Sequence, residues 1–292
     1  MTKSINIQGY IRFSYVGKTD TKMSTRFDDD KLGLYKAVFD PLRMERRFHL
    51  FEKLCLPGLR QQTDQDFSVV LIASTDMPET YKSRLEKAVK NTPQVCIRYS
   101  SSPTVLHATR PVVRRFVEEA EANTIHFRLD DDDVLGRNAI ALIKEYGARA
   151  VPDTIISLKF GYRLFKLEDR ALFLPEDVPF HSVGWARVNG PGDFRSPLKF
   201  SHTQAATRFP TIQVPCLGSY VYTMHEESDT RVKNNSFIEQ SVAARPSLFE
   251  AERQNELAAS VDAEFPALGH RGLQAALYEL PGGVEAENTE TS

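Results

Sequence analysis

Short apolar runs alternate with amphipathic segments along the first half of the chain. Four runs are rich in β-branched and aromatic residues, which predicts strands over residues 5–15, 67–73, 94–99 and 124–129. Between them, apolar side chains recur at helical spacing, which predicts helices over 43–54, 79–90 and 111–121. We expect the break at Pro57-Gly58 to end the first of these helices. Strands separated by helices in this order predict a parallel sheet, whose ligands bind at the carboxyl ends of its strands.

The second half of the chain has a different pattern. A helix is predicted over 137–149, and strands over 154–165 and 171–174 flank a hairpin turn at Glu168-Asp169. Residues 175–215 are rich in Pro, Gly, His and aromatic residues, which is typical of functional loops. A late strand over 220–224 ends at His225, and helices follow over 246–260 and 272–278. The acidic tail, 281–292, is predicted to be disordered.

Composition narrows the class of protein. The 292 residues can form one large α/β domain, and a net charge of -2 gives no reason to expect a nucleic-acid partner. The N-terminus has no signal-peptide core, and no apolar run approaches the ~20 residues of a membrane span. The three separated cysteines predict thiols in the protein core. We therefore expect a cytoplasmic protein, for which peripheral membrane contact stays open.

The run Asp130-Asp131-Asp132-Asp133 follows the strand at 124–129 directly. Four neighbouring carboxylates repel one another, and they become favourable when a divalent cation or a cationic group lies among them. A calcium-binding loop that starts at Asp130 would need Gly at its sixth position and an acid at its twelfth. The chain has Leu135 and Ala141 there, which excludes that motif.

Two kinds of chemistry remain for the acidic run. A phosphatase with an Asp-x-Asp-x-Val motif fits the letters up to Val134, but that motif normally ends the first strand, and three strands precede it here. A nucleotide-sugar transferase needs Mg²⁺ or Mn²⁺ to stabilise a departing diphosphate. If the chain stays extended, strand alternation places Arg128, Asp130 and Asp132 on one side. Arg128 then balances the carboxylates or contacts a phosphate, and Asp133 caps the next helix.

Two segments carry a family resemblance. RMERRFHLFEKLCLPGLRQQTDQDFSVVLIASTDMP (43–78) and IHFRLDDDDVL (125–135) resemble the bacterial rhamnosyltransferase family, a branch of the A-type glycosyltransferases. The resemblance is most specific at QTDQDF (62–67) and at the acidic run. It implies one α/β domain over 1–280, with a Rossmann-like nucleotide half at about 1–136 and an acceptor half at about 137–280 around a mixed central sheet.

The resemblance also implies a nucleoside-diphosphate sugar donor, a glycan or polysaccharide acceptor, and Mn²⁺ or Mg²⁺. Its Asp-x-Asp motif corresponds to Asp130 and Asp132, and a late histidine that completes the metal site corresponds to His225. The expected nucleotide-sugar contacts are Arg12, Asp76, Arg110, Arg128 and Asp131.

Inverting transfer requires a general base that deprotonates the acceptor hydroxyl. Asp193, in the loop GPGDF, is the first candidate and Glu226 the next. Trp185 either stacks on a sugar or belongs to the core. The chain is thus expected to be a metal-dependent glycosyltransferase, with rhamnose as the sugar that the family name indicates. An Asp-x-Asp phosphatase and a non-catalytic sugar-binding domain are the alternatives.

Overall fold

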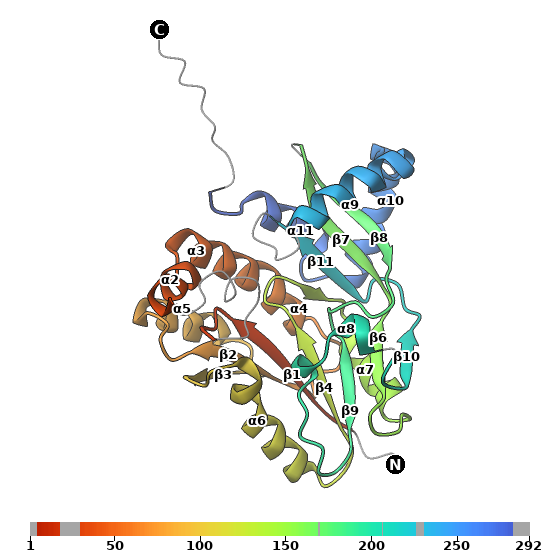
Figure 1. The fold of residues 1–292 in the computed structure, drawn as a ribbon. Coiled ribbons are helices and arrows are strands. Elements are labelled where there is room, and N and C mark those ends of the chain that lie inside the picture. Colours follow the sequence, from red (N-terminus) through yellow and green to blue (C-terminus); the bar gives the residue numbers. More distant parts are fainter. Residues whose placement is uncertain (1–4, 18–29, 169, 206, 226–230, 283–292) are drawn as a thin grey trace.

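The larger of two sheets forms the centre of the protein (Figure 1). The computed structural model describes residues 5–17, 30–168, 170–205, 207–225 and 231–282. Within these ranges the sheet has seven strands in the order β10-β6-β9-β4-β1-β2-β3. They are β1 (Asn6–Phe13), β2 (Ser68–Ser74), β3 (Val95–Ser100), β4 (Thr124–Leu129), β6 (Ile155–Leu158), β9 (Ala186–Asn189) and β10 (Thr211–Val214). The predicted parallel arrangement of β1 to β4 is confirmed, and β9, antiparallel to β4 and β6, makes the sheet mixed.

Both faces of β1, β2 and β4 are buried, and strand alternation decides which residues each face receives. Ile11 of β1 and Leu71 of β2 pack in the core beneath α3 (Pro41–Leu50) and α5 (Glu79–Val89). Tyr10 and Val70 point the other way and contact α6 (Val105–Ala120). On β4 the same rule puts His126 and Arg128 on the α6 face, as the sequence predicts.

In the first half of the chain, two helices differ clearly from their predicted bounds. α3 continues through a π-helical turn, η1 (Phe51–Cys55), into α4 (Leu56–Arg60), so the predicted break at Pro57-Gly58 is wrong. Pro57 lies in the first turn of α4, a position that tolerates proline. α6 starts six residues earlier than predicted, because Thr104 caps it by accepting the His107 N–H at 3.2 Å.

A smaller sheet lies beside the first (Figure 1). Its order is β5-β11-β7-β8, formed by β5 (Val134–Leu135), β7 (Phe160–Leu167), β8 (Arg170–Asp177) and β11 (Tyr220–Met224). The predicted hairpin is confirmed as β7 and β8. The single strand predicted over 154–165 is wrong, because the chain leaves the large sheet after β6 and enters the small one as β7.

The remaining helices connect or cover the two sheets. α10 and α11 pack on the small sheet through Leu257, Phe265 and Leu273. The bounds are α2 (Lys31–Val38), α7 (Ala139–Gly147), η2 (Pro197–Lys199), α8 (His202–Ala205), α9 (Arg231–Ala244), η3 (Pro246–Phe249), α10 (Ala251–Glu264) and α11 (Gly269–Tyr278). None of the helices in the described part of the chain has the length and apolar content to cross a membrane.

The ends of the chain and its cysteines complete the comparison. The backbone carbonyl of Pro281 accepts a hydrogen bond from Arg46 at 2.6 Å, and 283–292 lie outside the described residues. The predicted domain boundaries therefore stay predictions. Cys55 is buried as expected, whereas Cys96 is exposed, so the prediction of a core thiol is wrong for Cys96.

Candidate active site

The acidic run occupies the junction between the two sheets. β4 ends at Leu129, and the next residues form a turn in which the Asp133 N–H donates to the Asp130 carbonyl at 3.3 Å. β5 then begins at Val134 and pairs with β11. The chain is not extended beyond Leu129, which corrects the geometry behind the predicted alternation. The alternation of burial nevertheless holds, because Asp130 and Asp132 are half-buried while Asp131 and Asp133 are buried.

Asp132 and His225 meet at this junction. The His225 Nε2 lies 2.8 Å from the Asp132 Oδ2, and the Thr223 hydroxyl donates to the Asp132 carbonyl at 2.5 Å. Burial raises the pKa of Asp132, but the hydrogen bond and charge of His225 outweigh it and leave the pKa below its usual value. Two of the three predicted metal ligands are therefore in contact across 93 positions of sequence.

Asp133 has a structural partner instead of the predicted one. Its Oδ1 accepts the backbone N–H of Thr223 at 3.1 Å, which fastens β11 to the acidic run. The prediction that Asp133 caps the next helix is wrong, because α7 begins at Ala139 with Asn138 at the cap position. Burial, reinforced by the charges of Asp132 and Asp130, raises the pKa of Asp133 well above its usual value.

Asp131 is buried in an ion pair with Arg47. The Arg47 guanidinium lies 2.5 Å from the Asp131 Oδ1, and it also donates to the Arg12 carbonyl at 3.4 Å. Burial raises the pKa of Asp131 to about 6, although the positive charge of Arg47 opposes this increase. With 4% of its surface exposed, Asp131 lies away from solvent, which argues against the predicted contact with a nucleotide.

Arg47 itself is not among the residues that the sequence singles out. A signal exists, because Arg47 occupies the i+3 position after Met44 on the predicted helix and precedes the apolar position Phe51 by four. A charged residue on the apolar stripe of a helix needs a buried partner. That partner is Asp131.

Three predicted nucleotide-sugar contacts lie at the carboxyl edge of the large sheet. Arg12 is near the end of β1, Asp76 is exposed in the turn after β2, and Arg128 is near the end of β4. The Arg128 guanidinium lies 3.4 Å from both carboxylate oxygens of Asp130. The predicted edge thus gathers Arg12, Asp76 and Arg128 beside the acidic run. Arg110, another predicted nucleotide-sugar contact, lies in the second turn of α6 and not at its first residue.

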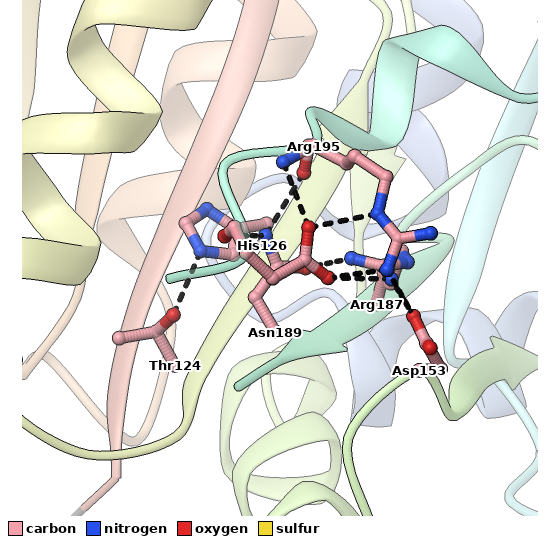
Figure 2. A network of polar contacts seen from close by, with 7 residues as sticks. Thr124, His126, Asp153, Arg187, Asn189 and Arg195 are labelled. Atoms are coloured by element: carbon pink, nitrogen blue, oxygen red, sulfur yellow. Dashed lines mark hydrogen bonds and ion pairs between the residues drawn. The ribbon is translucent and has the colours of Figure 1, made fainter. Parts of the chain in front are cut away.

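Arg187 and Arg195 lie together in a polar network with Asp153 (Figure 2), and Asp193 pairs with both arginines. Its carboxylate contacts Arg187 at 2.7 Å and the Arg195 Nε at 2.8 Å, and both arginines also contact Asp153. Burial raises the pKa of Asp193, but the hydrogen bonds from Arg195 and Arg187 outweigh this effect and lower the pKa to about 2.

These contacts argue against Asp193 as the general base. A carboxylate with so low a pKa, held by two guanidinium groups, is a weak proton acceptor. The preceding strand also ends at the wrong edge of the sheet, because Asn189 pairs with Thr124 at the start of β4. The second candidate, Glu226, lies outside the described residues. Trp185 is fully buried beside Ile155, Phe200 and Phe209, which confirms the alternative that it belongs to the core.

The chemistry of the acidic run fits a divalent cation. Carboxylate oxygens are the ligands that Mg²⁺ and Mn²⁺ prefer, and an imidazole suits Mn²⁺ as well. Within the acidic run, the Oδ2 atoms of Asp131 and Asp133 are buried without a hydrogen-bond partner among the described residues. Among the described residues, however, no three His, Cys, Asp or Glu side chains are already arranged around one metal position. The ligand set stays a prediction.

The fold defines the class first: an α/β protein with a mixed sheet and an acidic run at the carboxyl end of a parallel strand, the edge where ligands bind in such sheets. Residues 6–236, more than half of the chain, match the family model described as "Putative rhamnosyl transferase". The chain belongs to this family and is a glycosyltransferase. No curated protein sequence matches the chain.

Solved structures with similarity to the chain include two glycosyltransferase complexes. One is S. aureus TarS 1–349 with UDP-GlcNAc, at 13% identity and a TM-score of 0.41, covering 77% of this chain and 60% of that one. The other is GalNAc-T7 with UDP, GalNAc and Mn²⁺, at 10% identity and a TM-score of 0.43, covering 78% and 45% respectively. The chain therefore spans less than two thirds of the length of either structure.

Proposed function

We propose that the protein is a metal-dependent glycosyltransferase that moves a sugar from a nucleoside-diphosphate donor to a glycan hydroxyl with inversion. Rhamnose is the sugar that the family description suggests. The observation that carries the proposal is the contact of Asp132 with His225 at 2.8 Å, beside the half-buried Asp130. This contact brings the end of a parallel strand and the end of β11 to one position. Such a position at strand ends suits phosphate-bearing ligands.

In this proposal Asp130, Asp132 and His225 hold Mn²⁺ or Mg²⁺. The ion, when bound, supplies Lewis-acid stabilisation to the leaving diphosphate. Arg12 and Arg128 add positive charge at the same edge, where they orient the donor phosphates.

The other residues of the junction support these ligands. The Arg47–Asp131 pair and the two hydrogen bonds of Thr223 hold the turn of the acidic run in place. Positioning of this kind contributes to catalysis because reacting groups must be held in a narrow range of geometry.

The general base that we propose is Glu226, which follows His225 directly in the sequence. Its role would be to accept the proton of the acceptor hydroxyl as the new glycosidic bond forms. We also propose Asp76 as a nucleotide contact, because it is exposed at the carboxyl edge of β2.

The test is donor turnover. The purified protein is incubated with Mn²⁺ and a panel of nucleotide sugars, and release of nucleoside diphosphate is measured. We expect Asp132→Asn to lower release by about 100-fold or more, because it removes a charged ligand and the partner of His225. The matched control is Asp177→Asn. Asp177 is the last residue of β8, and its exposed carboxylate pairs with Lys159. The control is expected to retain full turnover.

Other outcomes would select the alternatives. Hydrolysis of phosphomonoesters without nucleotide-sugar turnover would indicate a phosphatase. Absence of both turnover and metal-dependent nucleotide binding would indicate a non-catalytic domain.

A further inference from the structure

A cleft lies between α6 and the loop that follows β9. Its volume is about 490 Å³, within the range of small-molecule sites. One wall is the first half of α6, and the other is the segment that leads from Gly192 into η2. Its lining residues are Leu106, His107, Arg110, Gly192, Asp193, Phe194, Arg195, Ser196 and Lys199.

The cleft carries uncompensated positive charge. Its one carboxylate, Asp193, is already neutralised by Arg187 and Arg195. Arg110 lines one wall and Lys199 the other, and neither makes an ion pair with a carboxylate of the described residues. Two cations held apart across a cleft favour an anionic ligand between them.

The loop wall of the cleft leads from the edge of the sheet where β9 ends toward the acidic run. Lys199 precedes His202 by three residues, which limits the separation of their Cα atoms to roughly 11 Å. Burial lowers the pKa of His202, and the charges of Arg128 and Asp130 also act on it. The side chain of Arg128 points toward the same face of the sheet that α6 covers. A ligand at the Lys199 end of the cleft therefore lies toward the edge where the donor sugar is proposed to bind.

We propose that this cleft binds an anionic sugar unit of the acceptor, one that carries a phosphate or a carboxylate. The inference rests on the proposed function and names the class of acceptor for it. Arg110 and Lys199 bind the anionic group, while the ring of Phe194, which stacks on Arg114 at 4.8 Å, forms an apolar floor. The loop wall belongs to the proposed acceptor half of the chain, and the donor diphosphate is proposed to bind at Asp130 and Asp132. Both assignments favour the acceptor over the donor as the source of the anion.

The binding experiment uses three sugars as probes: glucose 6-phosphate, glucuronate and uncharged glucose. Chemical-shift titrations of the full chain measure the dissociation constant of each. We expect the two anionic sugars to bind and glucose to bind at least tenfold more weakly. Lys199→Ala and Arg110→Ala should each weaken the anionic sugars by about tenfold. Arg115→Ala is the matched control, because Arg115 is an exposed arginine on the same helix, paired with Glu119 and outside the cleft. It should change nothing.

A competition experiment separates the two possible sources of the anion. UDP with Mn²⁺ is added to the protein that is saturated with glucose 6-phosphate. Simultaneous binding of both supports the acceptor cleft, and displacement by UDP would overturn it in favour of a donor subsite. Equal binding of glucose and glucose 6-phosphate would overturn it as well. Loss of UDP binding in Asp132→Asn leaves the cleft intact, so a result at one site can be told apart from a result at the other.

Discussion

Replacing Arg47 by methionine tests whether Asp131 is a buried charge that the fold must neutralise. The two side chains are 2.5 Å apart, and the exposed fraction of the side chain alone is 21% for Arg47 and 6% for Asp131. Removing one member of a buried ion pair costs about 3–5 kcal/mol, because the other charge loses its partner away from water. The partial exposure of Arg47 reduces this figure. We expect Arg47→Met to lower the free energy of unfolding by about 2–4 kcal/mol at pH 7.5.

The dependence of this cost on pH follows from the pKa of Asp131. Burial raises that pKa to about 6 in the presence of Arg47, and removing the guanidinium raises it further. At pH 5 the carboxyl group is protonated in both proteins, so the loss of Arg47 leaves no buried charge. The difference in unfolding free energy should therefore shrink as the pH falls from 7.5 to 5.

The assay is urea unfolding followed by the fluorescence of Trp185, the single tryptophan of the chain, which is fully buried. EDTA is present, so that a bound metal does not contribute to stability. Arg115→Met is the control, because the Arg115–Glu119 pair is solvent-exposed and is expected to contribute little to stability. The reasoning fails if Arg47→Met costs no more than the control, or if its cost is the same at pH 5 and pH 7.5.

Two further predictions concern buried polar groups. Burial lowers the pKa of His126 to about 3 in the folded protein. As the pH falls below about 6.5, the imidazole is therefore protonated in the unfolded chain while it stays neutral in the folded one. Stability should drop by roughly 3 kcal/mol between pH 6.5 and 4 from this group, and urea midpoints of His126→Gln should lack that part of the decline. The buried amide of Gln62 donates to two backbone carbonyls and accepts the Ile140 N–H at 3.1 Å. Gln62→Ala should lower the free energy of unfolding by roughly 2–4 kcal/mol, as measured by urea unfolding. The control is Gln94→Ala, which removes an exposed side-chain hydrogen bond to Gln65 and should cost less than about 0.5 kcal/mol.

The first four strands and their parallel arrangement could be predicted from sequence, because β-branched and aromatic residues gather in four short runs separated by helical patterns. The helix bounds were harder, since capping and packing override local breakers. Thr104 starts α6 ahead of Pro111, and the π-helical turn at η1 lets Pro57 enter the first turn of α4. The division of 154–165 between two sheets has no local signal at all. It depends on the pairing of β7 with β11, which comes more than fifty residues later.

The QTDQDF segment shows how a motif can be recognised before its purpose is known. Gln62 binds the backbone of α4 and of the residues after β5, and it accepts a hydrogen bond at the start of α7. Asp64 and Asp66 hold the nearly buried Lys144 of α7 at 2.9 and 3.1 Å. The motif therefore fastens the helix that follows the acidic run.

The sequence predicts that the side chains of the acidic run alternate between two sides because the chain stays extended, and the structure corrects this reason. The chain turns after Leu129, so strand alternation cannot separate the four carboxylates. Their burial still alternates, because each buried member has a partner at a fixed place in the fold. Arg47 of α3 reaches Asp131, and the backbone of Thr223 in β11 reaches Asp133. These two anchors leave the intervening Asp132 directed at His225. The pairs that hold the junction together are thus also what presents the proposed metal ligands, and this is why Arg47→Met should lower donor turnover even where the protein remains folded.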